Sequence, residues 1–287
     1  MFCYSARILA GMKQAMGAGN PLGQQSDYPT RYTPALWHPM PRAEARKRVG
    51  VAGAELQRGE DLWTGYEFSW LGPSGKPEVM GLHLRVPCQS LSIVESKSVK
   101  LYLGSYAQTR FGSAEHVHET LCRDFSSAFG ASVALELVPL SALAADLGDL
   151  DGRCLDDLDI QTDQYTLDPS LLGCRSGAAV EGQASVYTHL FRSLCPVTAQ
   201  PDWASIWVCY EGANIDPPGL LKYLISYRTH QAFHEVTVEQ IFADIKRCCA
   251  PERLAVYGRF QRRGGLDINP YRSDFDDVAP RWRTPRQ

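Results

Sequence analysis

Apolar residues at every second position predict two pairs of strands in this chain. The first pair is residues 62–71, which are rich in aromatic side chains, and residues 80–86, with a Gly-Pro-Ser-Gly turn at residues 72–75 between them. We expect this pair to form a β-hairpin. The second pair is residues 185–194 and residues 206–210, where Ile, Val and Tyr recur at alternate positions.

Helical spacing follows each pair. In the first half, apolar residues recur at helical intervals in residues 117–129, and residues 131–138 predict a closing strand. In the second half, residues 220–225 and 238–249 carry the apolar stripes of two helices, and residues 254–260 alternate as a final strand. The order strand pair, two helices, strand therefore occurs twice.

This repeat predicts an α+β protein made of two tandem modules, each with an antiparallel sheet and paired helices. The repeat concerns the order of elements, since we find no residue-level self-similarity. We assign residues 1–58 to an N-terminal extension packed on the modules, 59–145 to the first module, 146–182 to an acidic connection and 183–287 to the second, catalytic module.

Composition narrows the class of protein. The 287 residues are 44% hydrophobic and 21% charged with a formal net charge of -3, which disfavours a polynucleotide or an anionic membrane as partner. No apolar run approaches the roughly 18 residues that cross a bilayer, so we expect a cytoplasmic protein. The nine cysteines are odd in number and include no Cys-x-x-Cys pair, which favours reduced thiols over disulfides or a zinc ribbon.

One cysteine has the surroundings of a nucleophile. Cys195 lies between a predicted strand end and a loop with two prolines, Pro196 and Pro201, which bias the chain away from helix. Only roughly a few per cent of an ordinary thiol is thiolate at neutral pH, so a nucleophilic cysteine needs a base nearby. Asp202, seven residues on, is the candidate base. The alternative is that Cys195 is a small buried hydrophobe.

His234 and Glu235 lie where the two helices of the second module meet. A zinc-protease helix would need a second histidine at position 238, which is Val238, so that metal site is excluded; His230 and His234 could chelate only weakly. Glu235 could accept two parallel hydrogen bonds from the N1–H and 2-amino edge of a guanine-like base. A packed histidine and a solvated helix-end charge are the alternatives.

Two further segments suit phosphate. Ser96 and Lys97 lie where a strand leads into a helix, whose free N–H groups attract anions; the alternative is a serine N-cap with lysines on a solvated face. Arg263 and Gly264, in an Arg-Arg-Gly-Gly sequence, suit the phosphate that distinguishes NADPH from NADH, unless they form only a basic turn.

Taken together, these segments resemble the NADPH-dependent 7-cyano-7-deazaguanine reductases, the nitrile reductases of queuosine biosynthesis, in their long, two-module type. The resemblance covers the chain from about Asp61 to its end. It is carried, in matching order and spacing, by Glu95-Ser96-Lys97-Ser98, Cys195-Pro196-Val197-Thr198, Gln200-Pro201-Asp202-Trp203, Phe233-His234-Glu235 and Arg262-Arg263-Gly264-Gly265-Leu266-Asp267-Ile268-Asn269-Pro270.

The resemblance implies a tunnelling fold, in which modules assemble into a barrel, and a cytoplasmic homodimer that binds a small deazapurine but neither nucleic acid nor membrane. It implies reduction of the nitrile to a primary amine with NADPH as cofactor and without a metal. The catalytic residues would be Cys195, which forms a thioimide, Asp202, which donates and accepts protons, and His234. The deazaguanine would be held by Val94, Glu95, Ser96, His234 and Glu235, and NADPH by Ser96, Lys97, Arg263 and Gly264.

Three rival functions remain open on sequence grounds. A nitrile hydrolase would also form a cysteine thioimide, although no lysine is evident beside Cys195. A silent relative could bind a purine or pterin without reacting. A zinc-dependent cyclohydrolase of the same fold would hold zinc and turn over GTP.

Overall fold

The computed structural model describes residues 28–51, 56, 58–144, 147–177, 182–281 and 283–287. Residues 1–27 of the predicted N-terminal extension lie outside the described residues. The strands of the first half are β1 (Pro39–Pro41), β2 (Arg58–Leu71), β3 (Pro77–Pro87), β4 (Ser92–Val94) and β5 (Ala134–Val138). Its helices are α2 (Arg42–Arg48), α3 (Ser96–Gly104), α4 (Ala114–Phe129) and the 3-10 turn η2 (Leu140–Ala144).

The second half repeats the predicted order and adds two strands, β6 and β10. Its strands are β6 (Arg153–Cys154), β7 (Gln183–Leu194), β8 (Pro201–Glu211), β9 (Arg253–Phe260) and β10 (Leu266–Ser273). Its helical segments are η3 (Pro169–Leu171), α5 (Pro217–Ile225), η4 (Ser226–Thr229) and α6 (His234–Cys249). The predicted α+β class is confirmed, and both strand pairs are antiparallel hairpins.

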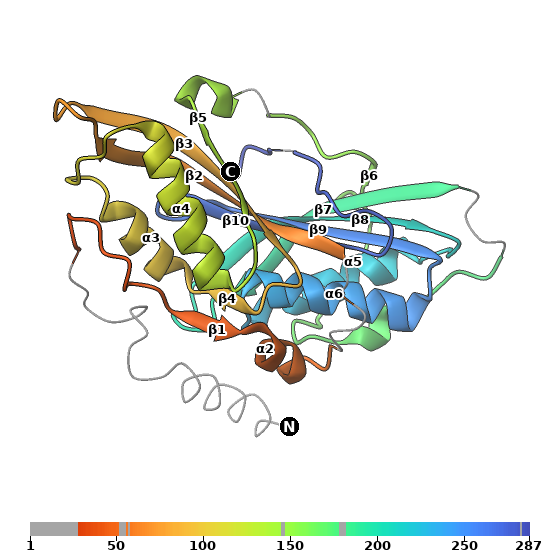
Figure 1. Ribbon diagram of the computed structural model, residues 1–287. Coiled ribbons are helices and arrows are strands. Elements are labelled where there is room, and N and C mark those ends of the chain that lie inside the picture. Colours follow the sequence, from red (N-terminus) through yellow and green to blue (C-terminus); the bar gives the residue numbers. More distant parts are fainter. Residues whose placement is uncertain (1–27, 52–55, 57, 145–146, 178–181, 282) are drawn as a thin grey trace.

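A single sheet runs through both halves in the order β5-β3-β2-β10-β9-β8-β7-β6, and β1 pairs separately with β4 (Figure 1). The helices α3, α4, α5 and α6 lie on one side of the large sheet. Each helix pair covers its own apolar core, one around Trp70 and Phe125 and the other around Tyr223 and Ile241. The helical spacing of the sequence predicted the buried stripe of α4 and α6 correctly.

Strand β10 joins the halves and was not predicted. It pairs antiparallel with β2 from Leu266 opposite Gly65 to Ser273 opposite Arg58, and with β9 at its end. No apolar alternation marks it in the sequence, because both faces of this central strand are buried and polar side chains such as Asp267 fill part of one face. The sheet is therefore continuous where the sequence predicted two separate ones.

The two halves do share residues, which corrects the expectation of no self-similarity. In the first half the Tyr102 hydroxyl lies 2.6 Å from that of Tyr106 and donates to Asp124 Oδ2 at 2.7 Å. In the second half the same contacts, at 2.8 and 2.7 Å, are made by Tyr223, Tyr227 and Asp244. The match is hidden in the sequence because the aspartate is offset by one position relative to the tyrosines.

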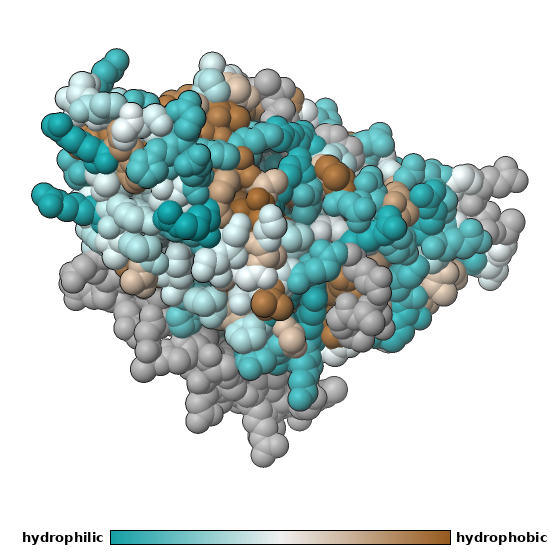
Figure 2. Space-filling model, viewed as in Figure 1, coloured by the Kyte–Doolittle hydropathy of each residue, from teal (hydrophilic) through white to brown (hydrophobic). Residues whose placement is uncertain are grey.

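The surface facing the viewer in Figure 2 is largely hydrophilic, with apolar residues in small scattered groups. Among the described residues, no helix has the length and apolar character to cross a membrane. The short N-terminal elements β1 and α2 lie against β4 and α6, where Arg42 and Arg46 of α2 are buried.

Candidate active site

A cavity lies where the two halves meet. It is bounded by the end of β4 and the start of α3 from the first half, and by the β7–β8 turn, the start of α6 and the β9–β10 connection from the second. Its wall is formed by Val94, Ser96, Lys100, Cys195, Pro196, Asp202, Ala232, Phe233, His234, Glu235, Gln261, Arg263, Leu266, Asp267 and Ile268. Another cavity, beside Tyr66 and Arg259, contains no cysteine among its lining residues. We therefore place the site at the first cavity.

Cys195 stands immediately after strand β7, in the turn that leads into β8. Its N–H donates to the Gln200 carbonyl at 2.9 Å and its carbonyl accepts from Ala199 N–H at 3.0 Å, so the turn is closed on both sides. Ala199 has a left-handed φ of 55°, which a non-glycine residue adopts only in a tightly constrained loop. The predicted non-helical segment is confirmed, and Cys195 is 8% exposed on the cavity wall.

Asp202 is the second residue of β8 and lies opposite Ser193 in the hairpin. The turn thus returns the carboxylate to the cavity that Cys195 borders, as the spacing predicted. One oxygen accepts a hydrogen bond from the Arg263 guanidinium, which also donates to the Pro201 carbonyl at 2.7 Å. The other lies 3.5 Å from His234 Nε2. Asp202 is therefore held between a cation and an imidazole.

His234 is the first residue of α6, and its ring is fixed on two sides. It stacks on Phe260 with ring centroids 3.8 Å apart. Its Nδ1 lies 3.3 Å from the Ile268 carbonyl, which can only accept, so we assign the hydrogen to Nδ1. Nε2 then faces the Asp202 carboxylate, 3.5 Å from its Oδ2, and both residues line the cavity that Cys195 borders.

Glu235 is buried with 2% exposure at the start of α6 and borders the cavity. Burial, together with repulsion from Asp61, raises the pKa of its carboxyl to about 7 against the opposing effects of His234 and Arg42. A carboxyl group with this pKa changes charge near neutral pH. It can accept two hydrogen bonds from a ligand when ionised.

Glu95 caps helix α3. Its carboxylate accepts from Lys97 N–H at 2.7 Å and from Ser98 N–H at 2.9 Å. The N-terminus of α3 is thus already occupied by an anion, so the expectation of free N–H groups for phosphate is wrong, and the cap is Glu95 instead of the serine of the alternative interpretation. Val94 and Ser96, on either side of this cap, line the cavity.

Lys100 lines the cavity and was missed in the sequence. It lies one helical turn after Ser96 on α3, so the i, i+4 spacing from Ser96 was the available signal. Burial lowers the pKa of Lys100, which Glu95 partly offsets. A lysine does therefore share the cavity with Cys195, although none was evident from the sequence.

Gly264 and Gly265 form the turn that precedes β10, with left-handed φ of 60° and 78°. A Cβ at Gly264 would lie 3.2 Å from Lys100 Cε and 3.3 Å from its Nζ, so only glycine leaves Lys100 its space. The turn places Arg263 on the cavity wall. Lys97 and Gly264 do not line the cavity themselves.

A second group of buried polar residues was not predicted. Asp267 lines the cavity, and its carboxylate accepts from the Tyr66 hydroxyl at 2.5 Å and from the Asn269 side-chain amide. Burial raises the pKa of Asp267. Asp267 belongs to the segment after the paired glycines, which the sequence analysis singled out. The pattern of that segment did not indicate a buried strand, so the position of Asp267 in the cavity was not predicted.

The structure brings together most of the predicted residues: Val94, Ser96, Cys195, Asp202, His234, Glu235 and Arg263 share one cavity. His230 does not join them on one helix, because η4 ends at Thr229 and α6 begins at His234, so the i, i+4 pair with His234 does not exist. In the part of the chain that the structure describes, no three potential ligands gather at a metal site.

A buried thiol, a carboxylate next to an imidazole, a lysine and an arginine on the wall of one cavity define a candidate enzyme active site. Residues 28–137 match the family model described as nitrile reductase, 7-cyano-7-deazaguanine-reductase N-term, and residues 201–277 match the model described as QueF-like protein.

Curated relatives match nearly end to end. A protein of Burkholderia cenocepacia (strain HI2424), named NADPH-dependent 7-cyano-7-deazaguanine reductase, is 48% identical over 273 residues, which are 93% of this chain and 98% of that protein. The protein of the same name from Burkholderia vietnamiensis (strain G4 / LMG 22486) is 48% identical over 272 residues, with the same coverage. The chain belongs to the family of NADPH-dependent 7-cyano-7-deazaguanine reductases, which confirms the resemblance.

A solved structure adds little. The apo form of the archaeosine synthase QueF-Like is 19% identical, covers 37% of this chain with all of its own length, and has a TM-score of 0.29. That score is too low to bear on the fold.

Proposed function

We propose that the protein reduces the nitrile of 7-cyano-7-deazaguanine to the primary amine of 7-aminomethyl-7-deazaguanine, with NADPH, in the biosynthesis of queuosine for tRNA. The observation that carries the proposal is the position of Cys195 and Asp202 at the two ends of one tight turn, on the wall of one cavity. Family membership supports the substrate class, and this geometry supports the proposed chemistry.

Cys195 is the nucleophile of the proposed reaction. A nitrile carbon is a poor hydride acceptor, whereas addition of the Cys195 sulfur converts it to a thioimide, whose C=N group is easier to reduce. The thiol proton is transferred in this step to the nitrile nitrogen. After the first reduction the C–S bond breaks, which leaves an imine for the second reduction and returns Cys195 to its free state.

Asp202 and His234 carry the protons. In the proposed reaction the Asp202 carboxylate takes the proton of the Cys195 thiol as the sulfur adds and passes it to the nitrile nitrogen; His234 Nε2 lies 3.5 Å from this carboxylate. The Arg263 guanidinium orients Asp202 through the other oxygen. His234 acts through Asp202. The contact between its Nδ1 and the Ile268 carbonyl keeps the imidazole turned toward that carboxylate.

The cavity suits a guanine-like base. Ionised Glu235 would accept the N1–H and 2-amino hydrogens, and Val94, Glu95 and Ser96 would hold the ring from the first half of the chain. A site built to accept specific N–H groups rejects analogues that lack them by roughly 10⁴–10⁵-fold. Glu95 would contact the deazaguanine through the carboxylate lone pairs that are not used in capping helix α3.

The residues around the cavity fit NADPH. Lys100 and Arg263 supply cations on its wall, and the missing Cβ of Gly264 leaves a cradle next to Lys100. We assign Ser96, Lys97, Arg263 and Gly264 to its binding, with Lys100 added. When bound, NADPH supplies the hydride for both reductions.

The finer fold assignments belong to this proposal. We infer a tunnelling fold in which residues 59–145 and 183–287 are modules of a barrel completed by a second copy of the chain, joined by residues 146–182 and preceded by an extension over residues 1–58. The open edges at β5 and β6 support this assembly, because unpaired strand edges favour pairing with another chain. The proposal includes a cytoplasmic homodimer without nucleic-acid contacts.

Incubation with 7-cyano-7-deazaguanine in the absence of NADPH tests the proposal. Mass spectrometry should show one substrate mass added to the protein, and Cys195→Ala should abolish the adduct. Adding NADPH should convert the nitrile to the amine. An adduct that persists in Cys195→Ala would refute Cys195 as the nucleophile.

Nitrile hydrolysis is the second candidate, because Lys100 shares the cavity with Cys195. Hydrolysis would release ammonia from the nitrile without oxidising NADPH. The same assay therefore separates the two, since reduction predicts NADPH consumption in step with amine formation and no ammonia.

A further inference from the structure

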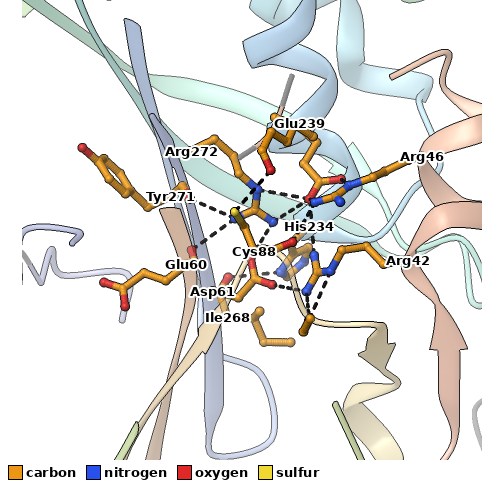
Figure 3. A network of polar contacts seen from close by, with 12 residues as sticks. Arg42, Arg46, Glu60, Asp61, Cys88, His234, Glu239, Ile268, Tyr271 and Arg272 are labelled. Atoms are coloured by element: carbon orange, nitrogen blue, oxygen red, sulfur yellow. Dashed lines mark hydrogen bonds and ion pairs between the residues drawn. The ribbon is translucent and has the colours of Figure 1, made fainter. Parts of the chain in front are cut away.

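A cluster of buried charges gathers around Glu239 of helix α6, one helical turn after Glu235 (Figure 3). It joins four elements, since α2 contributes Arg42 and Arg46, β2 contributes Asp61, α6 contributes Glu239 and β10 contributes Arg272. None of these five residues is more than 9% exposed. Figure 3 shows the guanidinium groups converging on the carboxylates.

Arg42 bridges the two carboxylates. Its Nη2 lies 2.7 Å from Asp61 Oδ2 and its Nη1 lies 3.3 Å from Glu239 Oε1. Ser90 Oγ accepts from its Nε at 3.2 Å and from its Nη2 at 2.8 Å. Since an arginine stays protonated in proteins, α2 places a fixed positive charge at this point.

Glu239 is a fixed negative charge one helical turn after Glu235. Arg46 Nη2 and Arg272 Nη2 each lie 2.8 Å from its Oε1. Burial acts to raise the pKa of Glu239, but Arg272, Arg46 and Arg42 together lower it to about 2. Glu239 therefore stays ionised at neutral pH and well below it.

Glu235 is the member of this region whose charge can change. Its pKa of about 7 follows from burial, from repulsion by Asp61 and from attraction by His234 and Arg42. The charged groups around it come from each neighbouring element: Asp61 of β2, Arg42 of α2, Arg272 and Asp267 of β10, and His234 and Glu239 of its own helix. Adding or removing one of these neighbouring charges should therefore shift the pKa of Glu235.

We propose that Arg42 is a positioning residue for substrate specificity, which acts with Asp61 through the charge of Glu235, so that helix α2 belongs to the recognition apparatus without touching the substrate. The inference rests on the proposed function, because it takes the ligand to be a base with adjacent N–H donors. Ionised Glu235 accepts both donors, whereas protonated Glu235 presents its own O–H to one of them.

Arg42 and Asp61 should shift the pKa of Glu235 in opposite directions, which distinguishes this role from a purely structural one. Arg42→Gln removes a cation and should raise the pKa of Glu235. Asp61→Asn removes an anion and should lower it. A residue that only held the fold together would weaken binding in both variants without moving the pH dependence in opposite directions.

The test measures the dissociation constant of 7-cyano-7-deazaguanine against pH in the full chain with Cys195→Ala, which prevents covalent capture. Binding should weaken below the midpoint set by Glu235. We expect Arg42→Gln to move this midpoint up by about one pH unit and to weaken binding at pH 7 about fivefold. Asp61→Asn should move it down.

Arg46→Gln is the matched control. Arg46 lies on the same helix and also bonds Glu239, but it is not among the main charges that act on Glu235. The variant should lower the melting temperature and leave the midpoint in place. If Arg42→Gln does not fold, Asp61→Asn carries the test alone, since only the electrostatic role predicts a downward shift.

Each outcome is decisive. The role of Arg42 is overturned if the binding midpoints stay in place, or if they move in the same direction in Arg42→Gln and Asp61→Asn. In that case, binding of 7-cyano-7-deazaguanine still supports the proposed function. If the Cys195→Ala protein binds no 7-cyano-7-deazaguanine at any pH, the proposed function fails and this inference fails with it.

Discussion

The ring of His234 lies flat on the ring of Phe260, with centroids 3.8 Å apart and planes 4° apart. The contact joins the start of α6 to the end of β9, the two elements that meet at the cavity. Phe260 is itself fixed, because its N–H donates to Asn269 Oδ1 at 2.9 Å and its carbonyl accepts from Gln287 Nε2 at 2.8 Å. The imidazole that faces Asp202 thus packs on a fully buried ring whose backbone is hydrogen-bonded on both sides.

Phe260→Leu tests this support. Without the ring, His234 should sample more orientations, and we expect kcat to fall roughly tenfold while the KM for the deazaguanine changes little. Steady-state kinetics measure the split. Phe125→Leu, at an equally buried aromatic in the other core, is the control; an equal fall in kcat in that variant would show a general loss of stability instead.

Asp202→Asn should cripple turnover and leave the fold intact, because asparagine has nearly the same shape but cannot exchange a proton. We expect kcat to fall by about 10²–10⁴-fold at an unchanged melting temperature. Gln200→Ala removes another contact of Arg263, from Nη1 to Oε1 at 3.3 Å, and should cost far less. Near-normal NADPH consumption by Asp202→Asn would remove this carboxylate from the mechanism.

Gly264→Ala should impair NADPH binding selectively. A methyl group there would crowd Lys100 and strain a φ of 60°. We expect the KM for NADPH to rise roughly tenfold, about the effect of 1.4 kcal/mol, with deazaguanine affinity unchanged. Gly265→Ala bears a similar strain at φ 78° but meets no atom within 4 Å, so it should do less. Equal effects would assign the loss to backbone strain alone.

Because of His230, we expect the folded protein to lose stability in acid. Burial lowers the pKa of His230 from 6.5 to about 4. Between these values the unfolded chain binds a proton that the folded chain does not, so stability should be complete above pH 6.5 and should decrease, by up to about 3 kcal/mol, as the pH falls toward 4. Urea unfolding at several pH values measures this.

The control for that experiment is His230→Phe, which cannot titrate. Its free energy of unfolding should depend less on pH across the same interval. If the pH dependence of the variant equals that of the parent, another group is responsible for the acid sensitivity.

Local pattern predicted the elements well because each depends on neighbouring residues. The alternation in β3 and the apolar stripe of α4 follow from burial of one face, and the prolines around Cys195 restrict the backbone wherever the turn lies. Strand β10 lacked such a signal, because a strand buried on both faces needs no alternation.

The sequence by itself determined the α+β class, the hairpins and helices, the turn that carries Cys195 and Asp202, and the family. The tertiary structure decided that β10 joins both halves in one sheet, that Lys100 and Asp267 reach the cavity, and that Arg42 bridges Asp61 and Glu239, one helical turn from Glu235. The physical reason is range: backbone preference and side-chain periodicity act over a few residues, whereas the charge of a buried carboxyl depends on groups that only folding brings close.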